Sequence, residues 1–563
     1  MINPILDAKE AAAALVDAAF QRAVAAGELP DAPLPAYVVE IPADITHGDF
    51  AANAAMVGAK ALHRAPRQIA QAICGHLELE GSPFQRVEIA GPGFINFFLG
   101  PQWFADVVRS VRQRGEDYGR SDYGKGEKIQ VEFVSANPTG PMHMGNARGG
   151  ALGDGLASAL DWAGYQVTRE FYVNDAGNQV EKFGASLEAR YLQLYLGEEA
   201  VPFPEDGYHG EDITQRARQF AQLHGDAYVQ ADSEARKKAL VEFALPLNIE
   251  KLRTDLERYR ITYDVWFRES TLHPDAVNAA IQKLADRGMT YEKEGAIWYK
   301  ATENGGEKDE VLVRANGFPT YFAADIAYHY NKFAVRGFQR VVNVWGADHH
   351  GHVARLKGAM DAIGLDGSKL DIVLMQLVRL MKDGQPYKMS KRTGKAISLT
   401  DLLEEVPVDA ARFFFNMREP NSTLDFDLDL AVEQSSQNPV YYVQYAHARI
   451  CSILKKLEEE GIQPRACNDQ ELLALTRPEE SALIRCLARF PQEVVDAAKN
   501  YDPARLTKYA IQVATDFHKY YNACRVKGEC DSLLQARLNL CLATRQVLRN
   551  LLSLLKISAP ESM

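Results

Sequence analysis

One segment, residues 131–154, constrains the fold of this chain more than any other. A β-rich run over residues 129–134 is broken by the loop Asn137-Pro138-Thr139-Gly140, and a stretch rich in Gly and Ala with helical character follows His143. A strand that is followed by a tight loop and then by the N-terminus of a helix directs backbone N–H groups toward an anion. The positive end of the helix dipole points the same way. The segment therefore predicts a phosphate-binding turn at the edge of an α/β sheet.

A second segment far downstream has the same character. Residues 387–395 contain Lys-Met-Ser-Lys-Arg followed by Thr393-Gly394, which predicts a basic loop. The alternative is a solvated basic loop with no ligand. Neither segment contains the Gly-x-x-x-x-Gly-Lys or Gly-x-Gly-x-x-Gly pattern of the common nucleotide-binding loops. Two phosphate-directed segments so far apart predict a nucleotide held between the halves of a split sheet.

Size and composition exclude several classes of protein. The chain has 563 residues, 47% of them hydrophobic and 25% charged, which is ordinary for a globular protein with several domains. A net charge of −12 argues against indiscriminate nucleic-acid binding. No apolar run approaches the roughly 18 residues of a membrane span, and the N-terminus lacks a secretion signal, so we expect a cytoplasmic protein. Seven cysteines without a Cys-x-x-Cys pair argue against a zinc ribbon or disulfide framework.

The hydrophobic pattern divides the chain into three parts joined by one linker. We expect an N-terminal α/β module over 1–114, a linker over 115–128, and an α/β parallel-sheet domain over 129–437 with a mostly helical insertion at about 184–295. From 438 to 563, apolar residues recur at helical spacing, which predicts an all-α bundle.

The motifs together resemble those of class I aminoacyl-tRNA synthetases. His143-x-Gly145-Asn146 and the downstream Lys-Met-Ser-Lys are the paired signatures of that class, and the flanking sequences at 132–141, 172–179, 345–352 and 555–561 resemble the bacterial arginyl-tRNA synthetase family. The resemblance runs from about His47 to the C-terminus. It implies a Rossmann-like catalytic domain, a helical anticodon-binding domain and an N-terminal module that contacts tRNA. It also implies ligation of L-arginine to tRNA(Arg) through an arginyl-adenylate, with ATP as substrate and AMP and diphosphate as products.

The resemblance also assigns roles to individual residues on the nucleotide side. The motif segment consists of Ala136, Asn137, Pro138, Thr139, Gly140, Pro141, Met142, His143, Met144, Gly145 and Asn146. The residues expected to be catalytic are His143, Asn146, Lys388 and Lys391. Those expected to bind ATP are His143, Gly145, Asn146, Gly346, Asp348, Lys388, Met389, Ser390 and Lys391. The alternative for His143 is an N-cap or turn histidine. The family commonly has a second His where this chain has Asn146, an uncharged donor, and we expect its phosphate contact to be weaker or shared with Arg148.

The guanidinium of arginine calls for a carboxylate partner, because bidentate pairing recognises both charge and shape. Asp325 is the position that matches the family, and Tyr321 lies four residues earlier on the same expected helix face. The full set expected to bind arginine is Glu132, Ser135, Asn137, Tyr321, Asp325 and His349. An exposed helix-surface Asp is the alternative for Asp325.

Residues 348–352, Asp-His-His-Gly-His, suggest a metal site, but three His within four positions do not easily converge on one ion. We therefore expect no protein-bound metal, and Mg²⁺ that accompanies ATP. In the C-terminal part, Tyr441, Tyr442 and Tyr445 with Gln444 and Arg449 either stack on anticodon bases or form a helix-core stripe, and the stripe is favoured for Tyr441 and Tyr445. The expected partners are tRNA(Arg), L-arginine and ATP, with a monomer and no membrane. The alternatives are a catalytically inactive tRNA-binding relative and a metal-dependent hydrolase.

Overall fold

A five-stranded parallel sheet is the centre of the molecule. The computed structural model describes residues 3–387 and 397–563. The strands lie in the order β12-β11-β5-β6-β7 and are all parallel. Their bounds are β5 (Lys128–Glu132), β6 (Gln166–Val173), β7 (Val265–Arg268), β11 (Arg340–Gly346) and β12 (Leu370–Met375). This is the doubly wound arrangement, and it confirms the Rossmann-like α/β prediction.

The strand order reverses between β5 and β11, where Glu132 lies opposite Asn343. In sheets of this kind, ligands bind at the carboxyl ends of the strands that flank such a switch point. Helix α5 (Met144–Trp162) starts directly above the end of β5 and is almost entirely buried. Its many Gly and Ala residues allow this, because Gly153 leaves room for Phe133, which a Cβ atom would approach to 2.3 Å.

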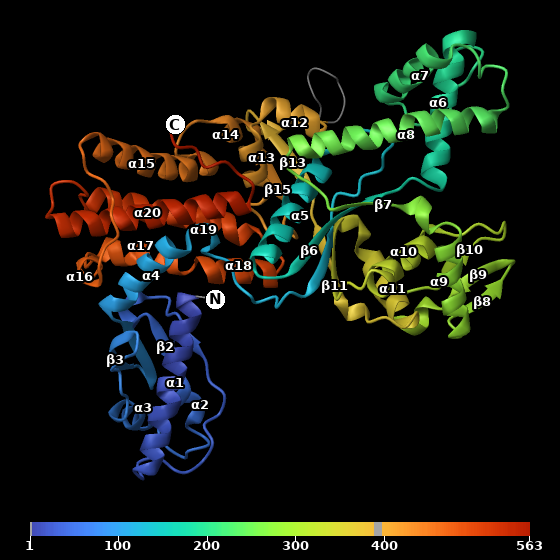
Figure 1. The fold of residues 1–563 in the computed structure, drawn as a ribbon. Coiled ribbons are helices and arrows are strands. Elements are labelled where there is room, and N and C mark those ends of the chain that lie inside the picture. Colours follow the sequence, from blue (N-terminus) through green and yellow to red (C-terminus); the bar gives the residue numbers. More distant parts are fainter. Residues whose placement is uncertain (1–2, 388–396) are drawn as a thin grey trace.

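The structure differs from the prediction in the insertion. Helices α6 (Asn178–Leu196), α7 (Glu211–His224) and α8 (Ser233–Arg258) form a separate lobe at the upper right of Figure 1. The chain then returns to the central sheet as β7, which lies inside the range 184–295 assigned to the insertion. Four residues after a long helix are too few for the period-2 pattern of a strand to be recognised.

A second small core follows β7. It contains helices α9 (Asp275–Asp286), α10 (Tyr321–Tyr330) and α11 (His350–Ala362), packed with an antiparallel sheet of order β10-β9-β8. The strands of this sheet are β8 (Thr290–Lys293), β9 (Ala296–Tyr299) and β10 (Glu310–Val313). Helices α10 and α11 bring side chains to the carboxyl edge of β11.

The N-terminal module projects from the body below α4 (Pro101–Arg114) in Figure 1. Its antiparallel sheet has the order β1-β2-β4-β3. The strands are β1 (Val39–Glu40), β2 (Phe50–Ala52), β3 (Phe84–Ala90) and β4 (Phe94–Leu99), and the helices are α1 (Pro4–Ala25), α2 (Ala54–Gly58) and α3 (Pro66–Gly75). Residues 115–128 follow as the expected linker, but they are packed against the body: the Tyr118 hydroxyl donates to the Leu487 carbonyl.

The chain after the central sheet is mostly helical, as predicted, with one additional small sheet of order β14-β13-β15. Its strands are β13 (Val378–Lys382), β14 (Gln385–Pro386) and β15 (Leu424–Asp427), and α12 (Leu399–Glu405), α13 (Val408–Phe415) and α14 (Leu428–Val432) lie around them. The C-terminal bundle contains α15 (Pro439–Glu459), α16 (Asp469–Leu472), α17 (Pro478–Ala488), α18 (Phe490–Lys499), α19 (Ala504–Ala523) and α20 (Asp531–Leu554). No helix within the described ranges is long and apolar enough to cross a membrane.

Candidate functional site

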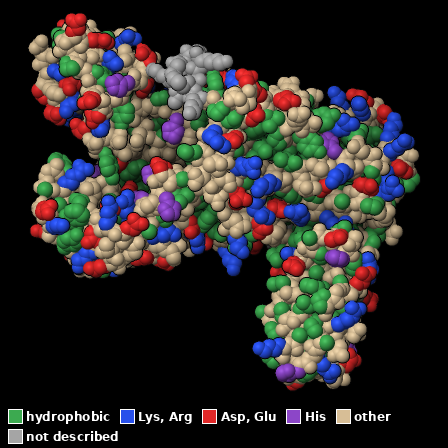
Figure 2. All heavy atoms as spheres, turned by 180° about the vertical axis from the view of Figure 1, so that it is seen from behind, with side chains coloured by type: hydrophobic (Ala, Val, Ile, Leu, Met, Phe, Trp, Pro, Cys, Tyr) green, Lys and Arg blue, Asp and Glu red, His purple; other side chains and the backbone are tan. Residues whose placement is uncertain are grey.

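A cavity of about 390 Å³ lies at the switch point of the central sheet. Five of the six residues predicted to bind arginine line it: Glu132, Ser135, Tyr321, Asp325 and His349. Seen from behind, histidine side chains gather in the hollow between the insertion lobe and the lobe of α9–α11 (Figure 2). The sixth residue, Asn137, lies exposed in the loop and is not among the lining residues.

The chain leaves β5 in an unusual backbone conformation. Val134 and Ser135 have φ values of 69° and 41°, a left-handed region that a β-branched residue rarely adopts. This turn directs the Ser135 hydroxyl back to Glu132, to which it donates at 3.0 Å, while the same oxygen accepts from the Tyr172 N–H at 3.1 Å. The backbone conformation of this turn thus helps to hold Glu132 at the cavity wall.

Glu132 is held from the other side by a lysine that the motifs did not indicate. Lys332 Nζ lies 2.6 Å from Glu132 Oε2 and 3.0 Å from Asn343 Oδ1, and the lysine side chain has no exposed surface. Burial lowers the pKa of Lys332, while the adjacent carboxylate of Glu132 opposes that shift. An uncompensated charge at such depth is strongly unfavourable, so each of the two charges depends on the other.

Hydrogen bonds connect this ion pair to Asp325. The amide nitrogen of Asn343 lies 2.9 Å from His329 Nε2, and His329 Nδ1 lies 2.8 Å from the backbone carbonyl of Asp325. A carbonyl only accepts, so Nδ1 carries the proton and Nε2 accepts from Asn343. Burial and the nearby Lys332 charge hold the pKa of His329 well below its ordinary value. The ring is therefore neutral, and it connects Asn343 to the backbone of Asp325.

The Asp325 carboxylate is oriented by a second histidine. His352 Nε2 lies 3.0 Å from Asp325 Oδ2, and His352 Nδ1 accepts from Arg355 Nε at 2.7 Å. Because arginine only donates, His352 must be neutral, with its proton on the side of Asp325. One carboxylate oxygen of Asp325 is thus held in a fixed direction. Tyr321 lies one turn earlier on α10, as predicted from the spacing of four.

The nucleotide side of the site begins at His143, the N-cap of α5. His143 Nδ1 accepts from the Gly145 N–H at 3.0 Å, and Asn146 Oδ1 accepts from the His143 N–H at 3.0 Å, which closes a reciprocal capping box. Desolvation lowers the pKa of the His143 ring. Since Nδ1 accepts, the proton of the neutral ring is on Nε2. His143 is thus an N-cap histidine. The residue is exposed, and within the described residues its Nε2–H makes no hydrogen bond, which leaves it for a ligand.

Gly145 has a steric role in this arrangement. A Cβ atom at this position would lie 2.9 Å from His143 Cε1, closer than real Cβ atoms approach, and 3.1 Å from Nδ1, which is a tight contact. The loop before the cap is held by the Asn248 amide, which donates to the Pro138 carbonyl at 2.9 Å. Helix α8 of the insertion thus supports the motif loop.

Arg148 does not share the phosphate contact expected of Asn146. Its side chain is fully buried and donates to the backbone carbonyls of Gln376, Glu419 and Ser422 at 2.7 to 3.0 Å. Burial lowers its pKa to about 10. The prediction that Arg148 shares the contact is therefore wrong, because three backbone carbonyls already bind its guanidinium.

Gly346 and Asp348 lie at the carboxyl end of β11, and their contact with a nucleotide stays a prediction. Gly346 lines the cavity, whereas Asp348 is 82% exposed and lies 3.7 Å from His349 Nε2. His352, the last histidine of the segment 348–352, contacts Asp325. Within the described part of the chain, no group of three or more His, Cys, Asp or Glu residues is placed to hold a metal ion. Lys388, Met389, Ser390 and Lys391 lie outside the described residues.

In the C-terminal bundle, two of the three expected tyrosines, Tyr441 and Tyr445, form a stack along α15. Tyr441 is stacked on Tyr445, which is stacked on His518, and the Arg449 guanidinium lies 4.5 Å from the Tyr521 ring centroid. All are partly exposed, so the stripe lies at the rim rather than within the core. Gln444 is buried and donates to Asp409 and to Ser558, which excludes it from the exposed rim.

Comparison with known proteins identifies the family. The description "Arginyl tRNA synthetase N terminal domain" matches residues 10–99, "tRNA synthetases class I (R), catalytic domain" matches residues 108–452, and "DALR anticodon binding domain" matches residues 443–563. An arginine–tRNA ligase of Ruminiclostridium cellulolyticum is 57% identical over 97% of both chains. One of Caldanaerobacter subterraneus subsp. tengcongensis is 56% identical over all of both chains.

Solved structures agree with these sequence matches. A putative arginyl-tRNA synthetase from Campylobacter jejuni has a TM-score of 0.75 at 32% identity and covers 83% of this chain and 100% of its own. The Thermus thermophilus enzyme shares the fold, with a TM-score of 0.73 at 23% identity over 97% of this chain and 99% of its own. With the catalytic-domain match alone spanning more than half of its length, this chain belongs to the arginyl-tRNA synthetase family.

Proposed function

We propose that this protein ligates L-arginine to tRNA(Arg) through an arginyl-adenylate, using ATP and releasing AMP and diphosphate. The observation that carries the proposal is the cavity at the β5–β11 switch point, which is lined by the carboxylates of Glu132 and Asp325. Ligands of doubly wound folds bind at such a switch point. Family membership and the identity to arginine–tRNA ligases over nearly the whole chain support it.

The guanidinium of arginine is proposed to pair with Asp325. His352 occupies Oδ2, and Asp325 lines the cavity, so a planar donor group in the cavity can approach the carboxylate. Tyr321 and His349 line the same wall. We propose that Ser135 and Asn137 hold the α-ammonium and carboxylate of arginine, and that Glu132 shapes the pocket for the guanidinium or the ammonium group. This assignment places the arginine carboxylate toward the start of α5, where the nucleotide is expected.

The α-phosphate of ATP is proposed to lie at the N-terminus of α5. The Nε2–H of His143, the N–H groups of the first turn and the amide of Asn146 are donors there, and such groups stabilise charge on phosphate oxygens during in-line attack by a carboxylate. Gly346 and Asp348 would contact the ribose. Lys388 and Lys391, with Met389 and Ser390, would surround the departing diphosphate. Mg²⁺ would arrive with ATP, held by phosphate oxygens and water.

The domain division is part of the same proposal. Residues 1–114 would contact tRNA, residues 129–437 would carry out catalysis, and residues 438–563 would bind the anticodon. We further propose that the protein acts as a monomer in the cytoplasm. Light scattering of the purified protein tests the oligomeric state, and fractionation of the producing cell tests the compartment.

A charging assay with total tRNA and each of the twenty amino acids tests the function. Arginine should be attached and AMP released in equal amount. Strong charging by another amino acid would refute the substrate, and no charging at all would favour an inactive tRNA-binding relative. Metal analysis of the same protein tests the hydrolase alternative, because stoichiometric zinc would support it.

A further inference from the structure

A second cavity, of about 570 Å³, lies away from the catalytic site. It is bounded by α20, by the C-terminal segment that follows α20, and by Arg260 in the turn after α8. The charged and polar groups that matter in its wall are Arg260, His447, Arg545, Arg549, Lys556 and Glu561. Four of these six are cations that stay charged at neutral pH, and Glu561 is the one carboxylate among them.

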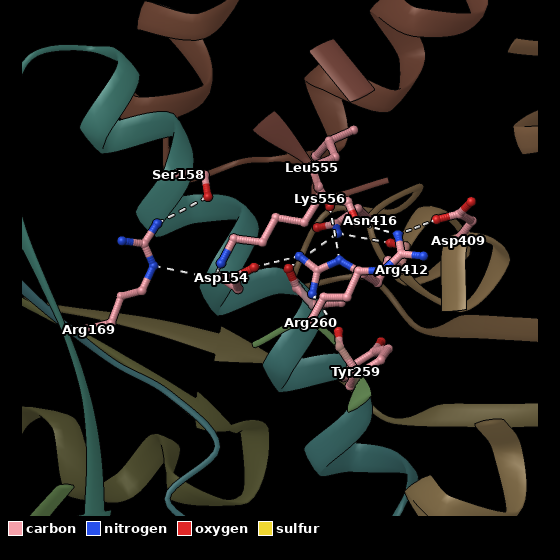
Figure 3. Close-up of polar contacts among 11 residues, drawn as sticks. Asp154, Ser158, Arg169, Tyr259, Arg260, Asp409, Arg412, Asn416, Leu555 and Lys556 are labelled. Carbon is pink, nitrogen blue, oxygen red and sulfur yellow. Dashed lines mark hydrogen bonds and ion pairs between the residues drawn. The ribbon is translucent and has the colours of Figure 1, made fainter. Parts of the chain in front are cut away.

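Two of the four cations are already neutralised by buried or half-buried carboxylates. Figure 3 shows Lys556 reaching Asp154 and Arg260 reaching Asp409. Asp154 has no exposed side-chain surface and also binds Arg412 and Arg169. These contacts hold the cavity wall in place and connect it to α5.

Arg545 and Arg549 are in a different situation. They lie one turn apart on α20, so both project from the same face of the helix. Arg549 is 3.8 Å from Glu116, and both side chains of this pair are largely exposed, where solvent makes an ion pair weak. Arg545 contributes to lowering the pKa of its neighbour Arg112, after burial, which is the larger cause. With Lys556 and Arg260 paired, two arginines remain against the single carboxylate of Glu561, so the wall keeps a net positive charge.

His447 adds a buried polar atom without a partner. The residue is only 3% exposed, and its Nδ1 donates to the Pro560 carbonyl at 2.8 Å. Within the described structure, its Nε2 has no hydrogen-bond partner, although buried polar atoms normally have one. Burial lowers the pKa of this ring and the hydrogen bond to the Pro560 carbonyl opposes that shift; among the nearby charges, Arg545 and Arg549 lower the pKa and Glu561 raises it. An anion between the two arginines would cancel their effect on the ring.

We propose that this cavity is a phosphate-binding site in which Arg545, Arg549 and His447 hold one phosphate group. Guanidinium groups match phosphate oxygens in charge and geometry. His447 Nε2 would accept from a P–OH group or donate once protonated. The phosphate comes either from the tRNA backbone, a source that rests on the proposed function, or from free phosphate.

The test compares wild-type protein with the double variant R545Q/R549Q and with the single variant R549Q. The matched control is K499Q/K508Q, which removes two exposed positive charges from α18 and α19. Thermal unfolding first identifies which variants are folded, and R549Q, at an exposed position, serves if the double variant is not. Titration with inorganic phosphate is followed by calorimetry, and tRNA binding is measured against salt concentration. Phosphate bound at the nucleotide site contributes equally in wild type, the variants and the control, so the comparison uses only the differences in phosphate binding among these proteins.

We expect R545Q/R549Q to bind inorganic phosphate with one site fewer than wild type and the control. If the source is tRNA, the variant also binds tRNA about tenfold more weakly, and its salt slope falls by roughly 0.7–0.9 per lost contact. Lost phosphate binding with unchanged tRNA binding would support the site and assign it to free phosphate. Variants indistinguishable from the control in both measurements would overturn the proposal. Arginine charging by wild type in the same preparations tests the proposed function separately.

Discussion

The two halves of the candidate active site are built in opposite ways. On the amino-acid side, Glu132 is paired with Lys332, a residue 200 positions away, and both are buried. On the nucleotide side, His143 and Asn146 hold each other across three positions at a helix N-terminus. The first arrangement depends on the tertiary fold, whereas the second depends on one turn of local backbone.

This difference has consequences for substitutions. A buried pair of charges cannot lose one member without leaving the other unpaired in a poorly solvated place. A helix cap that loses one hydrogen bond can be satisfied by water. We therefore expect changes on the amino-acid side to affect both stability and arginine binding, and changes on the nucleotide side to affect mainly the reaction rate.

The largest effect is expected for Lys332→Met. Removing the lysine leaves the Glu132 carboxylate unpaired, and breaking a buried pair costs about 3–5 kcal/mol. Chemical denaturation should show this loss in the free energy of unfolding. The double variant K332M/E132Q should recover most of it, because the charge is then absent. A single variant as stable as wild type would show that the pair is not a determinant of stability.

The next largest effect is expected for Asp325→Asn. This variant distinguishes the amino-acid side of the site from the nucleotide side, because only arginine binding should weaken. A hydrogen bond to a charged group contributes about 1.5–3 kcal/mol, so KM for arginine should rise roughly 10- to 100-fold while KM for ATP stays near the wild-type value. Steady-state charging kinetics measure both. Asp286→Asn, an exposed aspartate on α9, is the control. A rise in KM for ATP with an unchanged KM for arginine would mean that Asp325 belongs to the nucleotide side of the site.

Gly145→Ala tests the nucleotide side. The added methyl group collides with the His143 ring, which must shift, and a misplacement of about 1 Å costs on the order of 10²-fold in rate. For a smaller shift we expect adenylate formation to slow about tenfold, with arginine binding unchanged. Stability should not fall, because alanine favours helix over glycine by about 1 kcal/mol. Single-turnover kinetics decide, and an unchanged chemical step would remove His143 from the proposal.

The smallest effect is expected for Asn146→His. The amide oxygen that caps the His143 N–H is lost, which costs about 1 kcal/mol of unfolding free energy. The imidazole supplies a new donor for phosphate, charged below about pH 6.5, so activity should be kept or raised, most at the acidic end. Thermal unfolding and charging rates between pH 6 and 8 test this. Loss of both activity and stability would mean that position 146 has only a structural role.

Much of the fold could be predicted from residue patterns. The strand–loop–helix segment at 129–154 and the helical periodicity after 438 are local, and local backbone preferences together with hydrophobic period are encoded within a few residues. The same locality explains why the N-cap position of His143 and the shared helix of Tyr321 and Asp325 could be anticipated. The phosphate role of His143 stays a prediction. The strand β7 was missed because four residues carry too little pattern.

The partners inside the site were decided by tertiary packing. Lys332 is one lysine in an aromatic segment, and its neighbours do not show that it contacts a glutamate 200 positions earlier. Arg148 lies beside the motif in sequence, yet its guanidinium reaches carbonyls 228 to 274 positions away. Residue types and their spacing were sufficient to indicate the kind of chemistry. Which charges meet depended on how strands and helices pack, because the cost of burying a charge is set by the groups that surround it in space.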